Sequence, residues 1–191
     1  AARDKVNAEL GNPTGNAAAD AALKRAQAAW PAFRKFALAN NVATSGYTDD
    51  NLVVDLYGAA NKLDQALTEA IAALKPDPLP AEIHAANLLL QRTTTAYLKR
   101  AAQMSPDIGA SDDLDIAAET QRLDGLLQSL QKKLASRKDL AAPLRDIMGK
   151  WTFIKPRLVS YNESTVPYIV DRYARQMSSG LSQLATQATG R

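Results

Sequence analysis

One stretch decides the fold: Leu88-Leu89-Leu90-Gln91-Arg92-Thr93-Thr94-Thr95-Ala96-Tyr97-Leu98. A helical repeat of about 100° per residue places the apolar side chains around it on one stripe. Thr93 and Thr94 fall on this stripe, whereas Arg92 points the other way. Buried hydroxyl groups need hydrogen-bond partners. Two interpretations stay open: each threonine bonds back to a carbonyl of its own helix, or the hydroxyls line a polar pocket between helices.

The composition favours helices and excludes several classes of function. Of the 191 residues, 46% are hydrophobic and only 6% are aromatic, and alanine and leucine suit helices better than sheets. The net charge is +3 with basic residues scattered among acidic ones, so nucleic acid is not an expected partner. The lack of cysteine excludes a disulfide framework and a thiolate metal site. No apolar run approaches the roughly 20 residues that span a bilayer.

Apolar residues recur at steps of three and four, and this predicts an all-α, four-helix-bundle-like domain. The turn-forming run Gly11-Asn12-Pro13-Thr14-Gly15 predicts an irregular N-terminal segment over residues 1–15. Residues 16–190 are then expected to form a single helical bundle. Within it, turns containing proline, glycine or asparagine separate the periodic segments.

The bundle is predicted to consist of two related halves, approximately residues 16–75 and 82–190. Trp30 is followed by Phe33 and then by Val54-Asp55-Leu56-Tyr57. In the same way, Trp151 is followed by Phe153 and then by Val170-Asp171-Arg172-Tyr173. Two such helical pairs would combine into one four-helix bundle.

The sequence contains no pattern typical of an enzyme. It has no Ser/His/Asp order with supporting motifs, no glycine-rich phosphate loop and no paired buried carboxylates at helical spacing. Neither a catalytic residue nor a cofactor is predicted. The single histidine, His84, lies two residues from Glu82 and hence on another face of the helix, so no metal site is predicted. Arg92 is the best candidate for ligand contact, because a guanidinium can hold a carboxylate or nitrate through two hydrogen bonds; the alternative is a solvated arginine.

Residues 88–98 resemble the M-L-S-Q-R-M-A-K-A-Y-L box of the PilJ-type domain, the N-terminal sensor region of type IV pilus methyl-accepting chemotaxis transducers. Leu88 takes the place of the methionine, and direct matches are found at Gln91, Arg92, Ala96, Tyr97 and Leu98. Lys150-Trp151-Thr152-Phe153 resembles the family's x-W-x-F signature, and the run from Thr165-Val166-Pro167 to Tyr173 resembles the family's v-P-x-x-V-x-r-y/s run. The resemblance covers roughly residues 82–190.

The resemblance implies a periplasmic sensory module, similar to the four-helix domains of chemoreceptors and nitrate/nitrite sensor kinases. Such a module binds a small ligand or a protein partner to relay a signal, here through Gln91, Arg92, Thr93, Thr94 and Tyr97. It implies export, with a leader or anchor outside this chain, and it allows a membrane-tethered form and a homodimer. The alternative function is a structural or adaptor bundle that binds a partner protein through an exposed helix face, without a small-molecule site.

Overall fold

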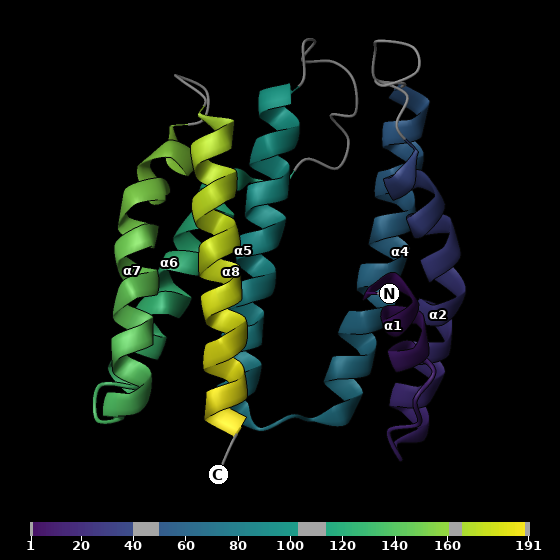
Figure 1. Ribbon diagram of the computed structural model, residues 1–191, viewed down its shortest axis with the longest axis horizontal. Coiled ribbons are helices and arrows are strands. Elements are labelled where there is room, and N and C mark those ends of the chain that lie inside the picture. The colour runs from purple at the N-terminus through teal and green to yellow at the C-terminus, as the bar shows by residue number, and fades with distance from the viewer. Residues whose placement is uncertain (1, 40–49, 103–113, 161–165, 190–191) are drawn as a thin grey trace. The chain divides into compact units, whose positions relative to one another are not determined.

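The computed structural model describes residues 2–39, 50–102, 114–160 and 166–189. Over these residues the chain forms seven helices and no strand (Figure 1), which confirms the predicted all-α class. Contacts within the chain divide it into two compact units, residues 1–76 and 77–191. The division falls between the two predicted halves. The second unit by itself contains four helices, and the single bundle over residues 16–190 stays a prediction.

The first unit contains α1 (Ala2–Leu10), α2 (Ala17–Leu38) and α4 (Asp50–Leu74). The prediction of an irregular segment over residues 1–15 was wrong for α1. Its sequence is rich in good helix formers, and Lys5 and Glu9 form an ion pair one turn apart, at 3.6 Å, which supports the helix. The predicted turn comes directly after α1, and there Gly15 takes a φ of +80° that favours glycine.

Asn16 begins α2 and also ties it to α4. Its side-chain oxygen accepts hydrogen bonds from the backbone N–H groups of Ala18 and Ala19 at 3.0 and 3.1 Å, which satisfies two donors at the helix N-terminus. Its side-chain nitrogen donates to the carbonyl of Ala73, near the end of α4, at 2.9 Å. The two helices therefore run antiparallel, as a hairpin.

The α2–α4 hairpin buries small side chains and leaves large ones partly exposed. Among the described residues of this unit, the buried hydrophobic residues are all alanines: Ala19, Ala22, Ala26, Ala59, Ala66 and Ala70. Alanine lets two helices approach closely but removes little apolar surface from water. Ile71 and Leu74 of α4 remain 50% and 43% exposed. The first unit is thus a helical hairpin whose apolar surface is only partly covered.

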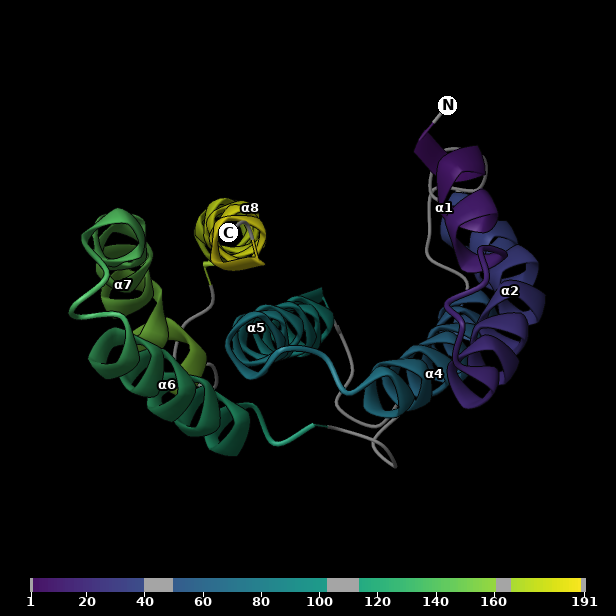
Figure 2. The same cartoon turned by 90° about the horizontal axis from the view of Figure 1, so that it is seen from below.

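The second unit is an antiparallel bundle of α5 (Pro78–Ala102), α6 (Ile116–Lys133), α7 (Lys138–Val159) and α8 (Pro167–Thr189). Each helix contacts the next one along the chain, and α8 packs against α5. Figure 1 shows the four helices alternating in direction, and Figure 2 shows them end-on, arranged as a ring.

Buried residues in this unit recur at alternating steps of four and three. On α7 they are Leu140, Leu144, Ile147, Trp151, Ile154 and Leu158. The same spacing holds for Ile116, Thr120, Leu123, Leu127 and Leu130 on α6. This heptad spacing is typical of helices that cross at a small angle with interlocking side chains. The second unit therefore has a continuous, leucine-rich core of a kind that the first unit lacks.

The predicted relation between the halves stays a prediction, because the two tryptophans share a helix position but differ in their surroundings. Trp30 and Trp151 are each the fourteenth residue of a 22-residue helix that opens a hairpin. Their surroundings differ, because Trp151 is 1% exposed whereas Trp30 is only partly buried. Val54 is 59% exposed and Val170 is fully buried, so the Val-Asp-x-Tyr runs occupy different helix faces. The three residues that the two runs share, Val, Asp and Tyr, did not reveal this difference in helix rotation.

Two glycines of the second unit provide a test of its packing. Gly125 on α6 has open space where a Cβ would lie, so Gly125→Ala should raise the free energy of unfolding by about 0.5–1 kcal/mol. Gly180 on α8 faces Ile147, whose Cγ1 would lie 3.1 Å from an added Cβ. Gly180→Ala should therefore gain less than Gly125→Ala, or lose stability. Urea unfolding of both variants measures the difference, and an equal gain at both sites would contradict the tight α7–α8 contact.

Candidate functional site

A row of polar side chains runs along the contact between α5 and α8; we call it the α5–α8 seam. It consists of Asn87 and Gln91 on α5 and Ser178 and Ser182 on α8. The Asn87 amide donates to the Ser182 hydroxyl at 3.0 Å. The Gln91 amide donates to the Asn87 side-chain oxygen and to the Ser178 hydroxyl, each at 3.2 Å. Asn87 is buried, Ser178 is partly exposed, and Gln91 and Ser182 are exposed, so the seam lies along the outer edge of the contact between α5 and α8.

The two threonines beside the seam behave differently. Both are buried, and the Thr93 hydroxyl donates to the Leu89 carbonyl of its own helix at 2.8 Å. Thr93 thus fits the local interpretation. The Thr94 hydroxyl is shielded from solvent and has no hydrogen-bond partner among the described residues. A buried hydroxyl without a partner costs free energy, and the local interpretation does not account for it.

Tyr97 links α5 to the start of α8. Its ring is fully buried, and its hydroxyl oxygen accepts a hydrogen bond from the backbone N–H of Val166 at 2.8 Å. Val166 directly precedes α8, and N–H groups at a helix start have no partner within the helix. Tyr97 is therefore an anchor between the two helices.

The five predicted site residues do not meet in one cavity. Thr93, Thr94 and Tyr97 lie inside the bundle, and Gln91 and Arg92 are exposed. None of them lines a hollow of about 440 Å³ in the first unit or one of about 530 Å³ in the second. Periodicity correctly separated Arg92 from the buried stripe. It did not show that Gln91 would bond across to α8, because that contact joins residues 87 positions apart.

A substitution at Thr94 tests whether its hydroxyl lacks a partner. Thr94→Val keeps the shape and removes the unpaired group, so the free energy of unfolding should rise by about 1 kcal/mol. Thr93→Val is the matched control and should change it by less than about 0.5 kcal/mol, since Thr93 is already bonded within its helix. Denaturant unfolding measures both. A loss of stability in Thr94→Val would show that the hydroxyl has a partner.

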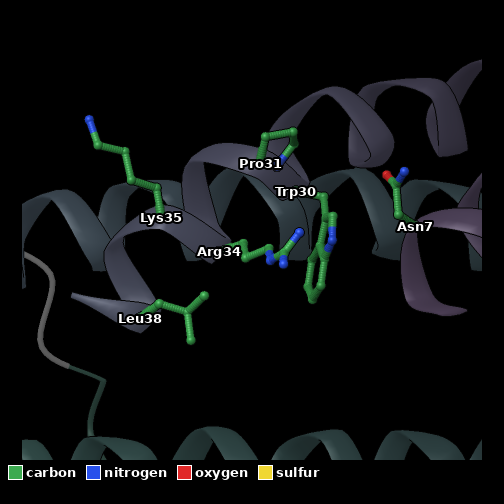
Figure 3. Close-up of a pocket in the computed structure, with 6 residues that line it drawn as sticks. All are labelled: Asn7, Trp30, Pro31, Arg34, Lys35 and Leu38. Atoms are coloured by element: carbon green, nitrogen blue, oxygen red, sulfur yellow. The ribbon is translucent and has the colours of Figure 1, made fainter. Parts of the chain in front are cut away.

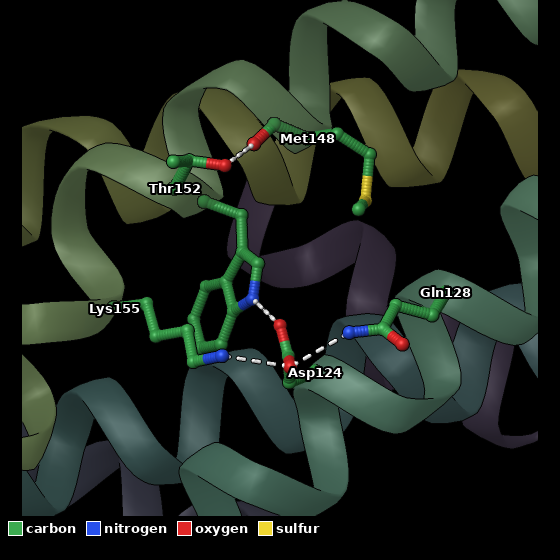
Figure 4. Close-up of polar contacts among 6 residues, drawn as sticks. Asp124, Gln128, Met148, Thr152 and Lys155 are labelled. Carbon is green, nitrogen blue, oxygen red and sulfur yellow. Dashed lines mark hydrogen bonds and ion pairs between the residues drawn. The ribbon is translucent and has the colours of Figure 1, made fainter.

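A second polar cluster, not predicted from the sequence, joins α6 to α7 around Asp124 (Figure 4). The Asp124 carboxylate accepts hydrogen bonds from the Trp151 indole at 2.7 Å, from Lys155 at 2.7 Å and from Gln128 at 2.9 Å. These residues border the hollow of about 530 Å³, which also includes Met148. The donors and acceptors of the cluster satisfy one another, which indicates a structural clamp between helices. Spacings of four residues, Asp124 to Gln128 and Trp151 to Lys155, were the only signals in the sequence.

Several groups act on the ionisation of Asp124. Partial burial raises its pKa, but the hydrogen bonds from Lys155, Trp151 and Gln128 and the charge of Lys155 outweigh this, so the pKa lies below the usual 3.8. A carboxyl whose pKa is lowered by folding stabilises the fold at pH values above its unfolded-state pKa. That contribution is lost as the pH falls through the folded-state value.

Replacing Asp124 should expose this dependence on pH. Asp124→Asn should lower the free energy of unfolding at pH 7 by about 1 kcal/mol, because it removes a charge-assisted hydrogen bond and a partly exposed ion pair. The difference from the parent protein should shrink as the pH falls below 4. Urea unfolding at pH 7, 5 and 3 checks this, and a constant difference would contradict the assignment.

The hollow of the first unit, about 440 Å³, lies between α1 and α2 (Figure 3). It is lined by Asn7, Trp30, Pro31, Arg34, Lys35 and Leu38. The lining is cationic and apolar. The Trp30 indole nitrogen is shielded from solvent and has no hydrogen-bond partner in the described part of the chain. The Trp30 N–H group therefore cannot donate a hydrogen bond to a ligand in this hollow unless the side chain moves.

The described residues contain no group of three or more His, Cys, Asp or Glu side chains able to hold a metal ion. No described helix is long and apolar enough to cross a membrane. No family model, curated protein or solved structure matches the chain. The resemblance to the PilJ-type domain therefore rests on the short motifs within residues 82–190 and stays a prediction; Thr165, in the last of them, lies outside the described residues.

Proposed function

We propose that this chain is a non-enzymatic sensory module in which a small ligand or a protein partner shifts α5 against α8. The observation that carries the proposal is the polar α5–α8 seam, a row of side-chain hydrogen bonds along the edge of the contact between two helices whose inner faces are mainly apolar. The resemblance of residues 88–98 to the PilJ-type box adds the sensory class. The proposed periplasmic location derives from that resemblance alone.

The chemistry of the seam suits a small displacement. Asn87 and Gln91 are one helical turn apart, and so are Ser178 and Ser182. Amides and hydroxyls each donate and accept, so the same four groups can exchange partners when one helix slides. Interlocked apolar side chains resist sliding, because a closely packed core has few intermediate arrangements. Shifts of about 1–2 Å between packed helices are a known means of transmitting a signal.

Each predicted residue then has a role in the proposal. Gln91 and Arg92 are exposed and make the first contact with the ligand or partner. Thr93 and Thr94 lie behind them, and Tyr97 joins α5 to the backbone at the start of α8. The Thr94 hydroxyl has no hydrogen-bond partner among the described residues, so an arrangement of α5 that gave it an acceptor would be stabilised.

Pairs of introduced cysteines can report the position of α5, because the chain has no cysteine of its own. The pair Asn87→Cys/Ser182→Cys joins residues that touch in the resting state. The pair Asn87→Cys/Ser178→Cys is offset by one turn of α8, so it forms a disulfide only when α5 moves along α8. A compound that acts on the seam should change the ratio of the two disulfide-formation rates, and it should raise the melting temperature.

The compounds to screen are inorganic anions, amino acids and small organic acids, chosen for the guanidinium of Arg92. A control pair, Asp124→Cys/Lys155→Cys, spans α6 and α7, which do not move in the proposal, and its parent side chains are 2.7 Å apart. Its cross-linking rate should not respond. Equal responses of the seam and control pairs would contradict a shift at the seam. If a compound does change the disulfide-formation rates of the seam pairs, Arg92→Ala should abolish that change.

An adaptor function is the second candidate, and an exposed aromatic pair favours it. Phe153 on α7 is 54% exposed, and its ring centroid lies 4.9 Å from that of Tyr173 on α8. Exposed aromatic side chains are frequent anchors in protein interfaces. A binding activity that Phe153→Ser abolishes and Arg92→Ala leaves intact would support the adaptor and contradict the seam.

A further inference from the structure

We propose that the α2–α4 hairpin packs against the same hairpin of a second copy of the chain, so that two first units complete a four-helix bundle. This association involves only residues of the first unit. It does not depend on the signalling function proposed for the α5–α8 seam.

The contact surface would be the α4 face, which we define by six apolar residues. They recur at steps of three and four and are Leu56, Ala60, Leu63, Leu67, Ile71 and Leu74. None of the six is fully buried, and Ile71 and Leu74 are 50% and 43% exposed. An apolar stripe with this spacing is typical of a helix that packs against another helix.

The second unit shows how this chain covers a comparable hairpin. There α7 has the same length as α2 and carries its tryptophan at the same position. Its third and tenth residues, Leu140 and Ile147, are buried in a core to which α5 and α6 contribute. The equivalent residues of α2 are Ala19 and Ala26, which are covered by α4. The described residues of the first unit supply no second hairpin to complete the arrangement.

The charges of the first unit suit association with itself. Residues 1–76 contain eight basic and eight acidic side chains, so two copies of the unit do not repel each other by net charge. The six residues of the α4 face are all apolar. A two-fold axis brings the same surface of both copies together, and here it would join apolar surface to apolar surface.

The size of the face indicates a weak dimer. Helix α4 has 25 residues and is about 37 Å long. A seam roughly 10 Å wide would bury about 700–800 Å² over both copies, less than the roughly 1,000 Å² of a stable interface. We therefore expect a transient dimer that is populated only at high protein concentration.

Sedimentation equilibrium of the whole chain at about 5–500 µM tests the association. Ile71→Glu places a charge in the α4 face at an exposed position, and it should weaken the dimer at least tenfold. Ala72→Glu is the matched control, because Ala72 is also exposed and lies next in the sequence but outside the α4 face. Its dissociation constant should stay within about twofold of that of the parent chain. Circular dichroism should show the same helix content in all three proteins.

Single cysteines locate the contact. A parallel pair of α4 helices would form disulfides with Leu63→Cys and with Ile71→Cys, whereas an antiparallel pair would form them mainly at Leu63, near the middle of α4. Either result supports the proposal if Ala72→Cys stays monomeric. A chain that stays monomeric at every concentration would overturn the proposal. If the Ile71→Cys thiol of such a monomer is also protected from maleimide, the α4 face is covered by another part of the same chain. A dimer that Ile71→Glu leaves unchanged would also overturn it.

Discussion

The burial of four heptad-spaced apolar stripes is the constraint on which the second unit depends. Each of its helices is amphipathic, and none can remove its stripe from water alone. Trp151 and the leucines of α6 and α7 meet Leu181 and Leu184 of α8 in one continuous core. The polar contacts between its helices depend on that core. Asp124 reaches the Trp151 indole, and Asn87 reaches Ser182, only because the stripes bring α6 to α7 and α5 to α8.

The same constraint is met incompletely in the first unit, where alanines form the contact between α2 and α4. Small residues bring the helices together but leave larger neighbours such as Leu67 only partly covered. The two units therefore illustrate two ways of packing a helical hairpin. One is closed by a second hairpin, and the other retains apolar surface of its own.

Much of the fold could be predicted from the sequence, because helical periodicity is a local property. Thr93 and Thr94 were expected on a buried stripe and are buried. Periodicity does not show how many helices share a core, so it could not show that residues 1–76 and 77–191 form separate compact units. That α2 would offer mainly alanine to α4, and so cover it poorly, depends on the pairing of the helices. The candidate site was less predictable for the same reason, since the contacts of Gln91 and Tyr97 are made with residues far along the chain, at or beside α8.

The distribution of the two tryptophans has a practical consequence. Each compact unit contains one indole, Trp30 in the first and Trp151 in the second. The Trp151 indole is buried and hydrogen-bonded to a carboxylate, whereas Trp30 is only partly buried, its indole nitrogen has no hydrogen-bond partner among the described residues, and its ring lies 5.7 Å from the Phe33 ring. The emission of each therefore reports on its own unit, and the chain carries two built-in optical probes with which the melting of one part can be followed apart from the other.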